Sequence, residues 1–60
     1  MALTSKELSW IEDQLTLEQL LVSKYRLAAS TVTDEAIKSK MEKIADRHQQ
    51  HFDRLLGHLN

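Results

Sequence analysis

Two stretches of this 60-residue sequence place apolar side chains at alternating spacings of three and four residues. That spacing is typical of one face of an α-helix. Proline is absent and the only glycine is Gly57, so no residue in the interior of the chain interrupts a helix. The sequence therefore predicts an all-α protein. The first stripe consists of Leu8, Ile11, Leu15, Glu18, Val22, Tyr25 and Ala29, and the second of Ile37, Met41, Ile44, His48, Phe52, Leu55 and Leu59.

Polar residues near the expected helix ends predict where the helices begin. Thr4 followed three residues later by Glu7 is a capping box, so a first helix is expected over about residues 5–30. The Ser, Thr and Val residues that follow have poor helix propensity. Thr33 is expected to cap a second helix over about residues 34–59.

A turn of about three residues between two helices makes them antiparallel neighbours. The sequence therefore predicts a helical hairpin as the single domain of residues 1–60. The alternative is one continuous helix, and no Gly or Pro in its interior argues against it. A helix of that length should, however, show sustained heptads of apolar residues and no capping residues in its middle.

A chain of this size buries too little surface for a robust core of its own. We therefore expect two hairpins to dimerise into a four-helix bundle, burying both stripes. The residues expected at this oligomer interface are Leu8, Ile11, Leu15, Val22, Ile37, Met41, Ile44, Phe52 and Leu55.

Glu18 and His48 stand at the centres of the two stripes, where a short chain normally has Leu. Burying a polar side chain without a partner costs about 2 kcal/mol or more. Antiparallel pairing around a turn near Val32 places the two residues at similar heights. They are expected either to satisfy each other by a hydrogen bond that sets the helix register, or to bind a metal together with the same residues of a second chain. The pattern requires no cofactor, and zinc or iron is the candidate ion.

Two further residues lie close enough to join such a site. His51 is about 60° from the centre of its stripe, so it is either a boundary residue or an additional ligand. Tyr25 is one heptad from Glu18 and is either a core aromatic or a support for a metal-bound carboxylate.

Composition excludes several classes of function. The formal charge of -1, with charges of both signs, does not predict nucleic-acid binding. No apolar run is long enough to cross a membrane, and the polar N-terminus lacks the apolar core of a signal peptide, so a cytoplasmic protein is expected. Without Cys, a glycine-rich phosphate loop or a Ser-His-acid arrangement, no enzymatic activity is expected. Trp10, Leu20 and Leu27 fall outside the centre of the stripe. Trp10 is either a boundary packing residue or a contact with another molecule, and Leu20 and Leu27 are either ordinary surface residues or part of a contact with another subunit or a partner protein.

The spacing of Glu18, Tyr25 and His48 resembles half of a ferritin-like bundle, in which one helix supplies a Glu, often with a Tyr seven residues on, and the next supplies Glu-x-x-His. By position, Glu18, Tyr25 and His48 match these residues, whereas Ala45 stands where the second Glu would be. The bridging carboxylate of a di-metal site is therefore missing.

Over nearly its whole length the chain resembles the short coat-F-like spore coat proteins of endospore-forming bacteria. The segments that carry this resemblance are Leu3-Thr4-x-Lys6-Glu7, Glu18-Gln19-Leu20-Leu21-Val22-x-Lys24-Tyr25 and His48-Gln49-Gln50-His51-Phe52-x-x-Leu55-Leu56-x-His58-Leu59. The resemblance implies a ferritin-like hairpin, association with the spore coat and with other coat proteins, and no established catalytic activity. We therefore expect a small structural or interaction protein that forms a homo-oligomer.

Overall fold

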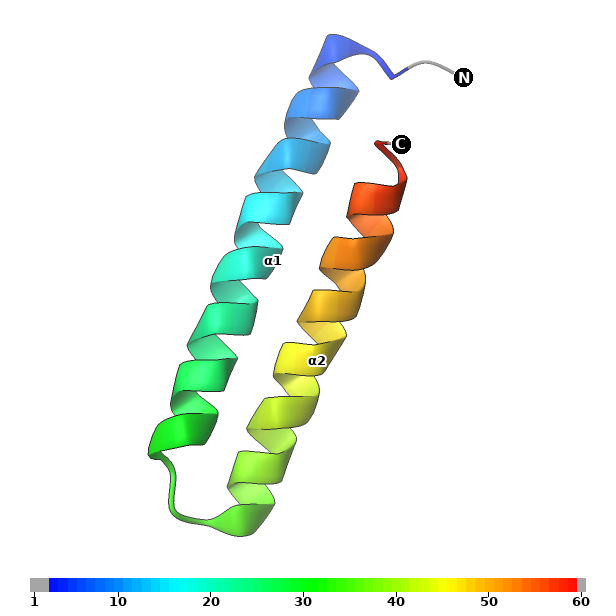
Figure 1. Cartoon of the computed structure of the whole chain (residues 1–60). Helices are drawn as coiled ribbons and strands as arrows, with labels where there is room; N and C mark the ends of the chain where they lie inside the picture. Colours follow the sequence, from blue (N-terminus) through cyan, green and yellow to red (C-terminus); the bar gives the residue numbers. More distant parts are fainter. Residues whose placement is uncertain (1–2, 60) are drawn as a thin grey trace.

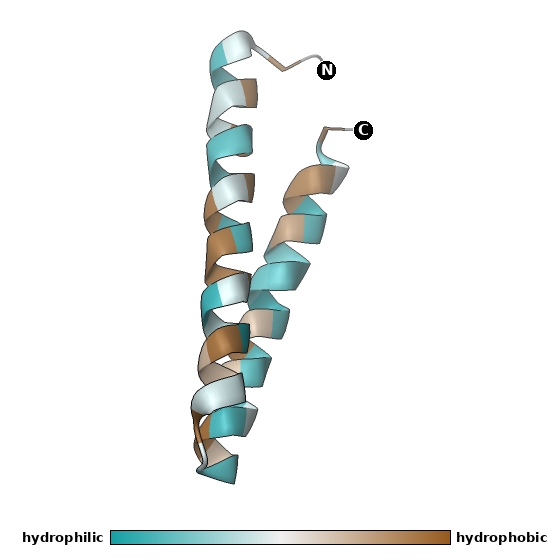
Figure 2. Cartoon of the chain, turned by 60° about the vertical axis from the view of Figure 1, so that its left-hand side comes forward, coloured by the Kyte–Doolittle hydropathy of each residue, from teal (hydrophilic) through white to brown (hydrophobic). Residues whose placement is uncertain are grey.

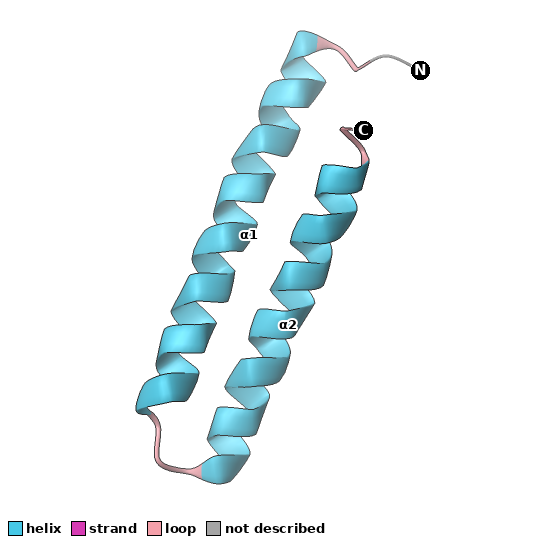
Figure 3. Ribbon diagram, viewed as in Figure 1, coloured by secondary structure: helices cyan, strands magenta, loops and turns pink. Residues whose placement is uncertain are grey.

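A computed structural model describes residues 3–59, which form two antiparallel helices joined by a short turn (Figures 1 and 3). Helix α1 spans Ser5–Thr31 and helix α2 spans Glu35–Gly57. The predicted all-α hairpin is thus confirmed, and the continuous-helix alternative is wrong because the helix is interrupted over residues 32–34. Met1, Ala2 and Asn60 of the expected domain lie outside the described residues.

The capping box forms as expected at the start of α1. The backbone N–H of Glu7 donates to the Thr4 hydroxyl at 3.1 Å, and the backbone N–H of Thr4 donates to the Glu7 carboxylate at 3.0 Å. Two hydrogen bonds with Thr4 lower the pKa of the Glu7 carboxyl group. The bond from the Thr4 backbone has the larger effect, and the bond with the Thr4 side chain has the smaller one. The N–H groups of Thr4 and Glu7 at the start of α1 are thereby paired without any tertiary contact.

At the turn, the structure corrects one detail of the prediction. The residue that caps α2 is Asp34, whose carboxylate accepts from the backbone N–H of Ile37 at 3.0 Å, and not the expected Thr33. An aspartate is the stronger cap because its charge also interacts favourably with the positive end of the helix. At the end of α1, the Ser30 and Thr31 hydroxyls donate back to carbonyl groups of the last turns.

The hairpin is long and thin, at 47 × 14 × 11 Å, and its helices meet along a narrow contact. Ala45 is fully buried at 0% exposure, so its small side chain lets α2 approach α1 closely. Buried residues on α1 complete this contact, namely Ile11, Glu18, Val22 and Ala29. No large side chain within residues 3–59 is fully buried. Neither of the described helices has an apolar stretch long enough to span a lipid bilayer.

The apolar side chains are distributed differently on the two helices. Brown, apolar turns recur along α1 in Figure 2, and several of its large apolar residues are exposed. On α2, the exposed large apolar residues are only Ile37 and Leu56, which lie near its two ends. Helix α2 therefore has one apolar face, whereas α1 has apolar side chains on more than one side.

Enlarging Ala45 should force the helices apart. Ala45→Leu is expected to lower the free energy of unfolding by about 1–3 kcal/mol, because the added atoms have no space at the contact. Ala36→Leu is the matched control on the same helix, where the exposed position should change stability by less than about 0.5 kcal/mol. Urea unfolding followed by circular dichroism measures both, and equal stabilities of the two variants would contradict the close packing of α2 on α1 at Ala45.

Candidate metal centre

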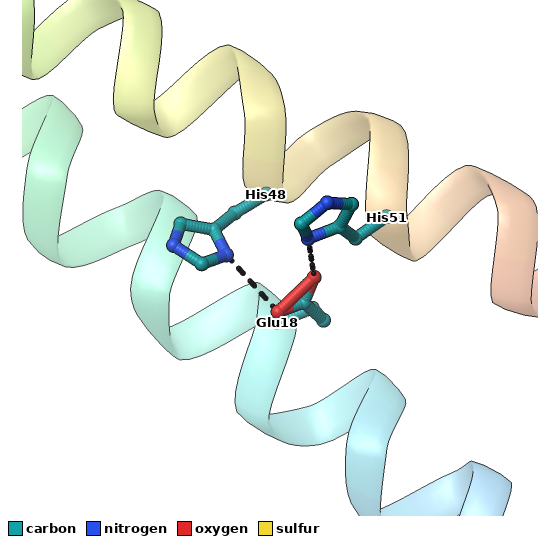
Figure 4. A group of neighbouring side chains, drawn as sticks. All are labelled: Glu18, His48 and His51. Carbon is teal, nitrogen blue, oxygen red and sulfur yellow. Dashed lines mark hydrogen bonds and ion pairs between the residues drawn. The ribbon is translucent and has the colours of Figure 1, made fainter.

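Glu18 is the one charged residue that is buried within residues 3–59, at 8% exposure. Helix α1 carries it on the face that contacts α2, in the middle of the hairpin, so its carboxylate is directed at the second helix (Figure 4). A carboxylate removed from water at this position needs hydrogen-bond donors or a cation nearby.

His48 on α2 supplies the first of these partners. Its Nδ1 lies 3.0 Å from Oε1 of Glu18, and with the proton on Nδ1 the ring donates to the carboxylate. The two residues are 30 positions apart in the chain, so this bond joins the helices. The expectation that Glu18 and His48 meet at the same height is confirmed.

Tyr25 contacts this pair through His48. The two rings stack with their centroids 6.0 Å apart and an angle of 15° between their planes. Within residues 3–59 no hydrogen bond joins the Tyr25 hydroxyl to Glu18, so Tyr25 supports the orientation of the imidazole and not the carboxylate.

His51 approaches the other oxygen of the same carboxylate. Its Nδ1 lies 3.0 Å from Oε2 of Glu18, and its ring meets that of His48 edge to face at 5.6 Å. Although the two atoms are close, they are not aligned as a hydrogen bond, and the buried Oε2 has no hydrogen-bond partner among the described residues. His51 itself is exposed, so solvent reaches this side of the group.

The three side chains form a group that could hold a metal ion. One ligand atom from each of Glu18, His48 and His51 can be chosen so that all lie within 4.8 Å of one another. A tetrahedral zinc ion with ligands at about 2.0–2.1 Å holds them about 3.3 Å apart. The two nitrogen-to-oxygen distances of 3.0 Å end at different oxygens of the carboxylate, and the ligand atoms of one three-atom set lie within 4.8 Å of one another, so these atoms would have to move closer together around an ion. An ion would also satisfy the unpaired Oε2, which is the strongest structural sign of a missing partner.

A shallow groove connects this group to solvent. It is lined by Gln14, Glu18, His51, Arg54, Leu55 and His58. The sequence pattern alone did not single out Gln14 and Arg54. Gln14 precedes Glu18 by about one helical turn, and Arg54 follows His51 by about one helical turn. His58 borders the groove but is not one of the three grouped residues.

Ala45 occupies the position at which the ferritin-like pattern has its second Glu. Because the side chain of Ala45 is a methyl group, it offers no ligand atom, and one hairpin supplies a single carboxylate to the group. The described side chains therefore include one group in each hairpin that could hold a metal ion.

The residues expected at an oligomer interface are only partly covered within one hairpin. Ile11 and Val22 are buried against α2, while Leu8 and Ile37 are exposed. The remaining five are half-buried: Leu15, Met41, Ile44, Phe52 and Leu55.

No family model matches this chain, and comparisons with curated proteins and with solved structures gave no match either.

The two histidines should contribute unequally to stability. His48→Ala removes the hydrogen bond to Glu18 and the stacking on Tyr25, so it is expected to destabilise the metal-free hairpin by about 1–3 kcal/mol. His51→Ala removes an exposed side chain without an aligned hydrogen bond, so its effect should stay within about 0.5 kcal/mol. Urea unfolding in the presence of a chelator measures both, and a larger loss for His51→Ala would contradict this assignment.

Proposed function

We propose that this chain binds a divalent transition-metal ion through Glu18, His48 and His51. The observation that carries the proposal is the buried Oε2 of Glu18, which lacks a hydrogen-bond partner and lies 3.0 Å from an imidazole nitrogen. Two imidazoles and one carboxylate are ligands that suit Zn²⁺ and Fe²⁺, and three protein ligands leave positions for water or for a residue of another molecule.

The ion would serve the fold of the hairpin. Its ligands come from both helices, so binding ties α1 to α2 at mid-height. A 60-residue chain with few buried side chains is marginally stable, and a ligand that binds only the folded state stabilises it by mass action. We therefore propose a structural metal and not a catalytic one.

Removing one ligand should weaken metal binding while the fold is kept. Calorimetric titration with Zn²⁺ is expected to show one ion per chain, and His51→Ala should bind it at least ~10-fold more weakly, since even indirect support of a ligand contributes this much. Binding should also weaken as the pH is lowered, because protons compete with the ion for the imidazole nitrogens.

His58→Ala is the matched control for that titration. His58 borders the same groove but is not among the grouped ligands, so its loss should leave the affinity within about twofold of the parent chain. If His48→Ala, His51→Ala and the parent chain all bound Zn²⁺ equally, the metal proposal would be wrong.

A second candidate function is that of a small structural protein that acts as a homo-oligomer. The observation that favours it is the exposure of Leu8 and Ile37 near opposite ends of the hairpin, together with the half-buried stripe residues between them. Two such hairpins related by a two-fold axis can cover these side chains in a four-helix bundle. The resemblance to coat-F-like proteins leads us to propose the spore coat as its location and other coat proteins as its partners.

This candidate predicts an oligomer whose assembly and folding are linked. Sedimentation at micromolar concentration should give a dimer or a larger species, because the hairpin alone leaves its stripe half-covered. Leu15→Asp should abolish helicity and association together, since it places a charge in that stripe. A well-folded monomer at this concentration would contradict the proposal.

A further inference from the structure

Helix α1 carries a second row of apolar side chains on the side away from Glu18. The row, here called the outer row, contains Trp10, Leu17, Leu20 and Leu27, with Asp13 and Lys24 at the two intervening positions. The apolar members are 61%, 46%, 63% and 67% exposed, respectively. Their spacings of seven, three and seven residues are those of positions a and d in a coiled coil.

The positions of the apolar and charged residues in the outer row are symmetric about the middle of the row. Leu17 and Leu20 are equally far along the helix from the peptide bond between Glu18 and Gln19. The same holds for Trp10 and Leu27, and for Asp13 and Lys24. In an antiparallel pair of α1 helices centred at that point, each residue of the row therefore faces the other member of its pair.

We propose that the outer row binds a second copy of this chain through an antiparallel, two-fold α1–α1 contact. Each Leu17 then faces Leu20 of the second copy, and each Trp10 faces Leu27 of the second copy. An isologous contact of this kind uses the same surface on both subunits.

Charge selects this occupant and this direction. In the antiparallel arrangement Asp13 faces Lys24 of the second copy, twice, so that opposite charges meet. A parallel pair would place Asp13 against Asp13 and Lys24 against Lys24, which is unfavourable. The symmetric arrangement of both the apolar and the charged positions is what a self-association surface requires, and an unrelated partner would not need it.

The side chains beside the row permit close approach. Ser9, Thr16, Ser23 and Ser30 follow one edge at intervals of seven residues, and they are small and uncharged. The Thr16 hydroxyl donates to the carbonyl of Glu12 at 3.2 Å, and that of Ser30 donates to the carbonyl of Leu27 at 2.7 Å. These two hydroxyls can lose water without losing their hydrogen bond.

This contact does not depend on the proposed metal site. The outer row is centred about 130° around α1 from Glu18, so the three metal-ligand candidates stay uncovered by it. The proposal can therefore fail without affecting the metal proposal, and the reverse is also true.

Reversing the charges tests the contact. Asp13→Lys and Lys24→Asp each place like charges in both facing pairs, so each should weaken self-association by about tenfold or more at low salt. The double variant Asp13→Lys/Lys24→Asp restores opposite charges and should recover the parent behaviour. Both positions are exposed, so helicity should be unchanged in all three variants, and Asp13→Lys should also leave Zn²⁺ binding unchanged. Sedimentation equilibrium measures the association, and single variants that associate like the parent, or a double variant without recovery, would overturn the proposal.

Cross-linking tests the direction of the pair, because the chain has no native cysteine. Trp10→Cys and Leu27→Cys chains are mixed and mildly oxidised, and mass spectrometry separates the products by mass. The antiparallel contact predicts that the mixed disulfide predominates, since two Trp10 positions would lie about 25 Å apart along the axis. Predominance of the Trp10→Cys homodisulfide, or a statistical mixture of products, would overturn it.

Discussion

The buried carboxylate of Glu18 requires a partner from the opposite helix, and the arrangement of the hairpin depends on that requirement. His48 meets it with a hydrogen bond of 3.0 Å. If α2 slipped by one turn along α1, Glu18 would face Ile44 or Phe52 and would be buried without a donor, which is costly. The Glu18–His48 pair therefore disfavours other registers of the two helices, as a buried polar residue does in a coiled coil. Apolar contacts alone would discriminate less, because the stripes contain similar aliphatic residues throughout.

His48 satisfies only one of the two carboxylate oxygens. The second, Oε2, lies beside His51 without an aligned hydrogen bond, although buried oxygens are nearly always paired. A structural role in setting the register explains Glu18 and His48 but leaves His51 and Oε2 without an explanation. A bound ion accounts for all three side chains, which is why we favour metal binding over a purely structural polar layer.

The two helices differ in how much apolar surface they leave uncovered. Helix α2 is apolar on one face, whereas α1 has the buried face and also the exposed outer row. A helix that is apolar on two sides is expected at the centre of an assembly. Under our proposals the half-covered stripe and the outer row would each bind another copy, on different sides of α1. Such a protomer can build assemblies larger than a dimer, which suits the structural role implied by the resemblance to spore coat proteins.

The sequence by itself determined the two helices, the turn and the residues on the inner face. Local features were enough for this, because the apolar periodicity, the Thr4–Glu7 capping box and the weak helix formers before Asp34 act within a few residues of chain. They also predicted that Glu18 would meet His48. The choice between Thr33 and Asp34 as the cap lay within the one-residue uncertainty of helix ends.

Only the tertiary structure decided what His51 does. Its position about 60° from the stripe centre allowed a boundary residue as readily as a ligand, since a helical wheel describes one helix at a time. The two oxygens of Glu18 extend from α1 toward two successive turns of α2, so they reach residues at and beside the centre of the stripe (Figure 4). Three other features likewise depend on how closely and at what angle the helices pack: the full burial of Ala45, the unpaired Oε2 and the exposure of the outer row. This packing is a property of the pair of helices and not of either helix alone.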